Sequence, residues 1–227
     1  MKYEIHGTVM QAVDVFLTAG QSVYTESGGM SWMVGDIEMQ TSTKGGLVAG
    51  LGRALAGESL FLTNYTCRSG EAVITFTPEA PGKILAFDLQ PGQVLICQKD
   101  SFMAADESVK LEMHFRKKLG AGLFGGEGFI LQKVTGPGTV LLEIPGEVRE
   151  YVLNAGETMK IDPGHIAIFE TSVTYDVSMV RGVKNILFSG EGLFLATLSG
   201  PGKIWLQSLP LSNLARKLAR YLPKPRG

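Results

Sequence analysis

Three stretches of the 227-residue chain share one pattern: VFLTAGQSVYT at residues 15–25, FDLQPGQVLIC at residues 87–97 and MKIDPGHIAIF at residues 159–169. In each stretch, apolar residues recur at every second position before a central glycine, and a second apolar run follows it. A period of two is typical of a β-strand, and Pro-Gly favours a type II turn. The central glycines, Gly20, Gly92 and Gly164, lie 72 and 72 residues apart. The sequence therefore predicts a repeated pair of strands.

A second motif, a Gly-Glu pair before an apolar strand, recurs with its glutamates at Glu58, Glu127 and Glu191. Two recurring motifs in three copies predict an all-β fold with three tandem repeats of about 70 residues. A unit that cannot bury its own apolar face is expected to pack with its copies around a common axis. We therefore predict one compact pseudo-threefold body, similar to a double-stranded β-helix. Its single domain spans residues 1–210, with repeats at about 1–80, 81–152 and 153–210.

The last 17 residues, 211–227, differ from the rest of the chain. Apolar residues recur there at helical spacing, at Leu211, Leu214, Leu218, Tyr221 and Leu222. Basic residues lie on the other side, at Arg216, Lys217 and Arg220. This pattern predicts a short amphipathic helix that ends before Pro223. The tail holds five basic residues and no acid, so the remainder keeps 16 basic against 22 acidic residues, a charge of −6.

Two roles fit such a tail. It can cap the β body, with Leu214 and Leu218 covering an open end. Alternatively, it can attach the protein to an anionic membrane surface or to an acidic protein partner, because basic residues are attracted to both.

Composition excludes several classes of protein. The net charge of −1 and the acidic body argue against a nucleic-acid binder. No stretch reaches the ~20 apolar residues that a membrane-spanning helix needs, and the first residues do not resemble an export signal. We therefore expect a soluble, cytoplasmic protein that can associate peripherally with a membrane. Cys67 and Cys97 are expected to be reduced, buried, small apolar residues.

Two glycine-rich connectors carry further candidates for protein–protein or membrane contact. The first supplies Leu47, Val48, Leu51, Arg53 and Leu55, and the second supplies Leu123 and Phe124. An exposed apolar patch of this kind marks an interaction site. The alternative is that both connectors are flexible or packed and make no outside contact.

The chemistry-bearing residues give weaker signals. Glu58, Glu127 and Glu191 could form a carboxylate ring around a cation, but each could equally accept hydrogen bonds from the backbone of its own repeat. His165 follows a Pro-Gly turn without a second ligand nearby, so we expect a structural hydrogen bond there and not a metal. No nucleophile elbow or phosphate-binding loop occurs. The sequence predicts no catalytic residue, no metal and no cofactor.

Three segments together resemble a known family: KGGLVAGLGRALAGESLF at 44–61, PGQVLICQKDSFMAAD at 91–106 and GEGLFLATLSGPGKIWLQSLPLSNLA at 190–215. They are similar to bacterial and archaeal relatives of the mitochondrial protein called altered inheritance of mitochondria twenty-four. The resemblance covers about residues 1–215. It implies a β-fold like that of the tryptophan RNA-binding attenuation protein, and a tendency to oligomerise. The mitochondrial relative is associated with inner-membrane organisation, and the family supplies no catalytic residues.

The function expected from the sequence is that of a non-enzymatic, self-associating binding or scaffold protein, a homo-oligomer that can lie at a membrane surface. The alternative is a small-molecule-binding protein or an enzyme with its pocket between repeats.

Overall fold

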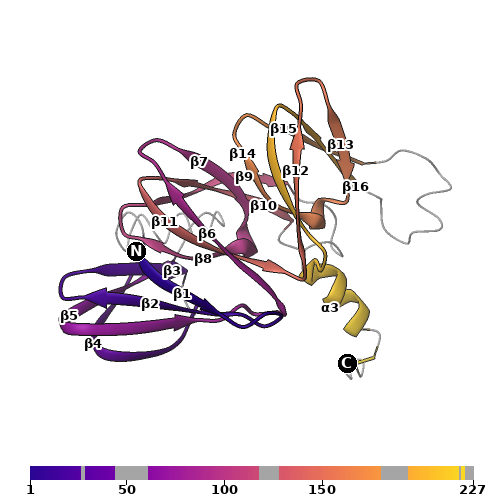
Figure 1. Ribbon diagram of the computed structural model, residues 1–227. Coiled ribbons are helices and arrows are strands. Elements are labelled where there is room, and N and C mark those ends of the chain that lie inside the picture. The colour runs from indigo at the N-terminus through magenta and orange to yellow at the C-terminus, as the bar shows by residue number, and fades with distance from the viewer. Residues whose placement is uncertain (27–28, 44–60, 118–127, 180–193, 220, 223–227) are drawn as a thin grey trace.

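The structure, a computed structural model, describes residues 1–26, 29–43, 61–117, 128–179, 194–219 and 221–222. Within these ranges the chain forms antiparallel β-sheets and a short C-terminal helix (Figure 1). The prediction of an all-β fold with one terminal helix is confirmed. The residues of both glycine-rich connectors, and Glu58, Glu127, Glu191 and Arg220, lie outside the described residues.

The first sheet has eight strands in the order β1-β2-β5-β3-β8-β11-β6, with β4 on the other edge of β5. The strands are β1 (Lys2–His6), β2 (Ala12–Thr18), β3 (Ser22–Glu26), β4 (Met30–Thr43), β5 (Phe61–Phe76), β6 (Gly82–Leu89), β8 (Phe102–Asp106) and β11 (Gly138–Pro145). The long strand β5 pairs with β2 through its second half and with β3 through its first half. Its opposite edge pairs with β4, which therefore lies at the border of the sheet.

The second sheet has six strands in the order β12-β17-β14-β7-β10-β9, and the third has three in the order β13-β16-β15. The second comprises β7 (Val94–Gln98), β9 (Lys110–Lys117), β10 (Phe129–Thr135), β12 (Val148–Leu153), β14 (Ile166–Glu170) and β17 (Gly202–Gln207). The third comprises β13 (Thr158–Ile161), β15 (Thr174–Met179) and β16 (Phe194–Ser199). Two single-turn 3₁₀ helices, η1 (Lys99–Ser101) and η3 (Pro163–His165), and the helix α3 (Leu211–Ala219) complete the described elements.

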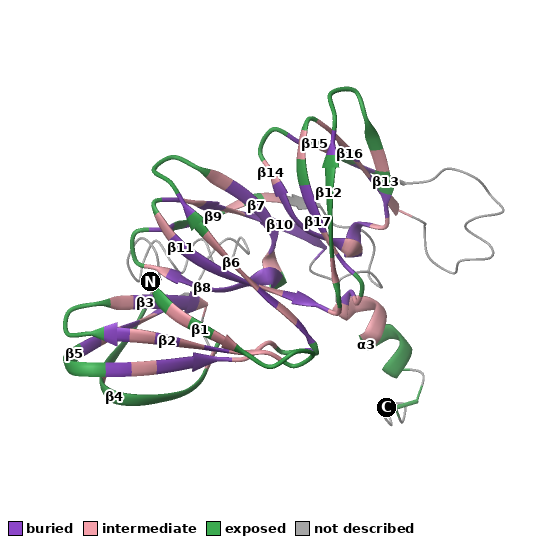
Figure 2. Cartoon of the chain, viewed as in Figure 1, coloured by how far each residue is buried: buried purple, intermediate pink, exposed green. Residues whose placement is uncertain are grey.

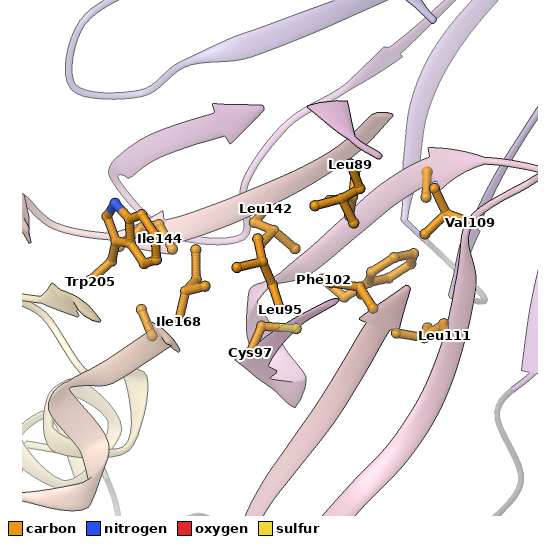
Figure 3. Packing of buried hydrophobic residues seen from close by; sticks show 14 of the residues in the cluster. Leu89, Leu95, Cys97, Phe102, Val109, Leu111, Leu142, Ile144, Ile168 and Trp205 are labelled. Carbon is orange, nitrogen blue, oxygen red and sulfur yellow. The ribbon is translucent and has the colours of Figure 1, made fainter. Parts of the chain in front are cut away.

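Three apolar clusters hold these sheets together. The central cluster joins the first and second sheets, with Tyr24 and Leu142 from the first and Leu95, Ile168 and Trp205 from the second (Figure 3). The other two clusters lie toward the ends of the molecule, and Figure 2 shows the buried residues running along the facing strands of neighbouring sheets. Cys67 and Cys97 are buried and unpaired, as predicted.

Within the described ranges, one type of hydrogen-bonded turn occurs three times: at Gln21 after β2, at Gln93 after β6 and at Glu157 after β12. In each, the side-chain oxygen accepts from the backbone N–H of the residue three positions earlier, at 2.9, 3.0 and 2.7 Å. The backbone N–H of the same residue donates to the carbonyl of that earlier residue, at 2.9, 2.9 and 3.0 Å. A glycine with positive φ precedes each of these residues: Gly20, Gly92 and Gly156.

The glycine of the third turn is Gly156, and the prediction that Gly164 corresponds to Gly20 and Gly92 is wrong. Gly164 lies in η3, where its N–H donates to the Asp162 carboxylate at 3.0 Å. The aspartate caps this 3₁₀ turn between β13 and β14, so the Pro-Gly pair that follows lies in η3 and not in the turn found at Gly20 and Gly92. The matching turn around Gly156 contains no proline, so the Pro-Gly pattern in the sequence did not identify it.

Candidate functional site

Of the interaction residues predicted from the sequence, Arg216 and Lys217 are described, and both lie exposed on α3. The predicted carboxylate ring and the apolar connectors lie outside the described residues. Exposed apolar side chains gather at the end of α3 and on the solvent side of the first sheet, and others, such as Val9, Met10 and Val152, are exposed elsewhere in the described part.

A polar network of the body lies below the first turn of α3. The side-chain amide of Gln207 donates to the Gln98 side-chain oxygen at 2.9 Å and to the Gly164 carbonyl at 2.6 Å. His165 Nδ1 lies 2.8 Å from the Gln207 carbonyl, which confirms the structural role expected for this histidine. Pro210 lies beside Gly164, and a cavity of about 230 Å³ separates this network from the helix. The start of α3 therefore rests on η3 and β17.

The end of α3 projects into solvent. No residue of the helix is buried; Leu214 is half-buried, and Leu218 is 52% exposed. The hypothesis that Leu218 covers an open end of the body is therefore wrong, because only the first turn reaches the body. Tyr221 and Leu222, which follow the helix, are 80% and 66% exposed. We call Leu218, Tyr221 and Leu222 the helix tip.

The solvent side of the first sheet carries a row of apolar side chains across three strands. Phe16 on β2 pairs with Val73 on β5, which pairs in turn with Val34 on β4. Trp32 lies two residues from Val34 on the same face of β4, because side chains alternate between faces along a strand. Val34 is 69% exposed and Trp32 is 55% exposed. We call these four residues the outer patch.

A hollow of about 460 Å³ lies over the outer patch, with Phe16, Val34, Val73, Lys2 and Glu71 among its lining residues. Sequence analysis did not predict this surface. The signal was present in Trp32-Met33-Val34, where consecutive apolar residues must place some of their side chains on the solvent face.

Acidic side chains border the outer patch on both sides. Glu71, opposite Thr18, lies along one side of the row, and Asp14, opposite Glu4 on β1, lies along the other side. Asp14 accepts a hydrogen bond from Thr75 and lies 3.1 Å from His6 Nε2.

One base faces the patch directly: the Lys2 ammonium lies 5.3 Å from the centre of the Phe16 ring. The three carboxylates around the patch, those of Glu4, Asp14 and Glu71, outnumber its one base, Lys2. The border of the patch is therefore acidic.

A third feature is an acidic cavity of about 490 Å³ between β3, β11 and η1. Glu26, Glu79, Asp100 and Glu143 line it together with Lys99. Burial raises the pKa of the Glu143 carboxyl to about 7, and the nearby Glu79 and Asp100 carboxylates add to this rise. The backbone N–H of Glu79 donates to Glu143 Oε2 at 3.0 Å and partly offsets it.

The described histidines do not form a nucleophile–base pair. A hydrolytic triad needs an imidazole hydrogen-bonded to a hydroxyl or thiol nucleophile. His6 contacts Asp14, His165 contacts a backbone carbonyl, and His114 lies against the Tyr175 ring. In the chain His6–Asp14–Thr75, the carboxylate stands between the imidazole and the hydroxyl. Among the described residues, no three His, Cys, Asp or Glu side chains are placed to hold a metal ion.

Within the described part of the chain, no helix has the length and apolar character needed to span a bilayer. Comparison with known proteins gives relatives without an assigned activity. An uncharacterised protein of Streptococcus pyogenes serotype M6 is 33% identical over 219 residues, which cover 93% of this chain and 86% of the relative. The X-ray crystal structure of protein SPYM3_0169 from Streptococcus pyogenes is similar with a TM-score of 0.80 and 29% identity. That similarity covers 97% of this chain and 99% of the other.

A family model described as mitochondrial biogenesis AIM24 matches residues 3–209, which include nearly all of the β body and exclude α3. The resemblance seen in the three sequence segments is confirmed. This chain belongs to the AIM24 family.

Proposed function

We propose that this protein is a non-enzymatic, self-associating binding or scaffold protein. The observation that carries the proposal is the pair of exposed apolar surfaces, the outer patch and the helix tip, on an otherwise well-packed β body. Contiguous exposed apolar groups of this kind mark interaction sites, because water contact with them is unfavourable.

The arrangement of the polar residues supports a binding role over catalysis. Each described histidine contacts another group: His6 contacts a carboxylate, His165 a backbone carbonyl and His114 an aromatic ring. The buried polar network at Gln207 links β7, β17 and η3 below α3, as expected of contacts that stabilise the fold. These contacts stabilise the body and position the helix.

We further propose that the body is built from three repeats around a pseudo-threefold axis. The three turns at Gln21, Gln93 and Glu157 support this, because each makes the same two hydrogen bonds. A body of repeated units offers several similar edges for contact, which suits a scaffold.

Native mass spectrometry of the purified chain tests the proposed function. We expect an oligomer without additional mass. A monomer at micromolar concentration would contradict self-association. A stoichiometric extra mass would instead support the alternative of a small-molecule-binding protein, for which the acidic cavity lined by Glu79, Asp100 and Glu143 is the candidate pocket.

Attachment to a membrane surface is a second candidate function, favoured by the basic residues Arg216 and Lys217 beside the apolar helix tip. Such a helix binds anionic lipid through its apolar face and its basic residues. Sedimentation with anionic and with zwitterionic vesicles tests this function. We expect binding to the anionic vesicles alone, and its loss in the Arg216→Glu, Lys217→Glu double variant. Equal sedimentation of this variant and the original chain would contradict it.

A further inference from the structure

We infer that the helix tip of one copy docks on the outer patch of a second copy, so that the chains associate head to tail. This inference rests on the proposed self-association and names the two surfaces that meet. The occupant of the outer patch is thus the C-terminal helical segment of another molecule of the same protein.

The two surfaces match in apolar character. The helix tip presents Leu218 in the last turn of α3 and Tyr221 and Leu222 three and four positions later, just after the helix, where the Tyr221 backbone N–H donates to the Leu218 carbonyl at 2.9 Å. An amphipathic segment with this spacing fits a shallow apolar groove. The hollow of about 460 Å³ over the outer patch offers such a groove, with Phe16, Val34 and Val73 lining it.

The two surfaces also match in charge. Arg216 and Lys217 accompany the helix tip, whereas Glu4, Asp14 and Glu71 border the outer patch. The same opposition holds for the whole chain, in which residues 211–227 carry a charge of +5 and the remainder carries −6. Opposite potentials steer two surfaces together and disfavour contact between two like surfaces. Charge therefore favours tail against body over tail against tail.

The fold keeps the two surfaces of one molecule apart. The base of α3 is fixed on η3 and β17, and Figure 1 shows the helix well separated from β1, β2 and β4. A tail that stays on its base reaches the outer patch of another molecule and not its own. An interface between two different patches is heterologous, so it generates a ring or an open filament.

The test uses two full-length variants, each lacking one surface. Val34→Lys places a charge in the outer patch that opposes the basic tail, and Leu218→Asp disrupts the helix tip. Val34 lies on an edge strand and Leu218 is half in solvent, so both variants are expected to fold. Val152→Lys on β12 is the matched control, because Val152 is 59% exposed, lies on an edge strand of the second sheet and belongs to neither surface.

We expect each variant alone to be monomeric in light scattering after size-exclusion chromatography, with an association constant lowered at least tenfold. Mixed in equal amounts, the two variants keep one intact tail and one intact outer patch between them. They are therefore expected to form a dimer and nothing larger. The Val152→Lys control is expected to associate like the original chain.

Two results would overturn the inference: a mixture that stays monomeric, or single variants that associate as the original chain does. A Leu218→Asp chain that keeps its oligomeric mass but no longer sediments with anionic vesicles would assign the helix tip to a membrane instead. If the original chain is itself monomeric, both the proposed self-association and the docking of the helix tip on the outer patch are wrong.

Discussion

At the residue scale, Glu143 is a carboxyl whose pKa in the folded protein lies well above its ordinary value. It lies on β11 beside two other carboxylates, those of Glu79 and Asp100, in the acidic cavity. Burial, the largest cause, raises its pKa from 4.5 to about 7. A carboxyl with a raised pKa in the folded state holds a proton that the unfolded chain has already released.

The contribution of Glu143 to the free energy of unfolding depends on pH. Between pH 4.5 and about 7, the folded protein binds more protons at Glu143 than the unfolded chain does, so the contribution of this group to stability falls as the pH rises. Above about 7, both states are ionised and the loss is complete. Glu143→Gln removes this loss, because its side chain stays neutral.

We predict that Glu143→Gln stabilises the protein by about 1–2 kcal/mol at about pH 8 and changes little at about pH 5. Urea unfolding at both pH values measures the effect. Glu107→Gln, at an exposed turn, is the control and is expected to be neutral at both. An equal effect of Glu143→Gln at the two pH values would show that the carboxyl is not protonated in the folded protein near neutrality.

At the scale of elements, a few buried polar contacts hold together the part of the body from which α3 begins. Gln207 on β17 bridges Gln98 at the end of β7 and Gly164 in η3, and it is 4% exposed. These two hydrogen bonds hold the side chain in one position, because a buried polar group that loses its partner costs free energy. The network thus joins two strands and a turn directly below the helix.

Replacement of Gln207 is predicted to be destabilising. Gln207→Ala leaves the Gln98 side-chain oxygen and the Gly164 carbonyl without this donor, and we expect a loss of about 1–3 kcal/mol. Proteolysis should also cut the tail sooner, because its base is loosened. Gln40→Ala, at an exposed position on β4, is the control for thermal unfolding and for cleavage. Unchanged stability of Gln207→Ala would indicate that water replaces the lost contacts.

At the scale of the whole molecule, the chain divides into an acidic body and a basic tail. Since no residue of α3 is buried, the tail adds little to the apolar core. Its attraction to the body of another copy is electrostatic as well as apolar, and salt screens the electrostatic part.

Removal of residues 211–227 is expected to abolish association and to leave the stability of the body nearly unchanged. We expect the truncated body to unfold within a few degrees of the full chain, because its three apolar clusters contain no residue of α3. We also expect it to be monomeric. Thermal unfolding and light scattering measure the two properties. Loss of folding on truncation would restore the hypothesis that the tail caps the body.

Salt gives an independent check. The mass of the full chain in light scattering should fall as sodium chloride rises from about 50 to about 500 mM, because the Debye length shortens from above 10 Å to below 5 Å. An association that strengthens with salt would point to apolar contact alone and would contradict the charge argument.

Sequence alone determined the fold class, the terminal helix, the state of the two cysteines and the family. These follow from local patterns: a period of two along the strands, helical spacing at Leu211, Leu214 and Leu218, and motifs that recur along the chain. The structural role of His165 was also predicted, because no second ligand stands near it in the sequence.

Tertiary structure decided what depends on residues far apart in the chain. The outer patch needs Phe16, Val34 and Val73 to pair across three strands. The raised pKa of Glu143 comes mainly from burial, and the Glu79 and Asp100 carboxylates, which other segments supply, add to it. The third turn was misplaced because the sequence around Gly164 matches the other two stretches, whereas the positive φ and the turn hydrogen bonds lie at Gly156 and Glu157. Strand pairing and burial are non-local, so a pattern along the chain predicts which elements form but not which side chains meet.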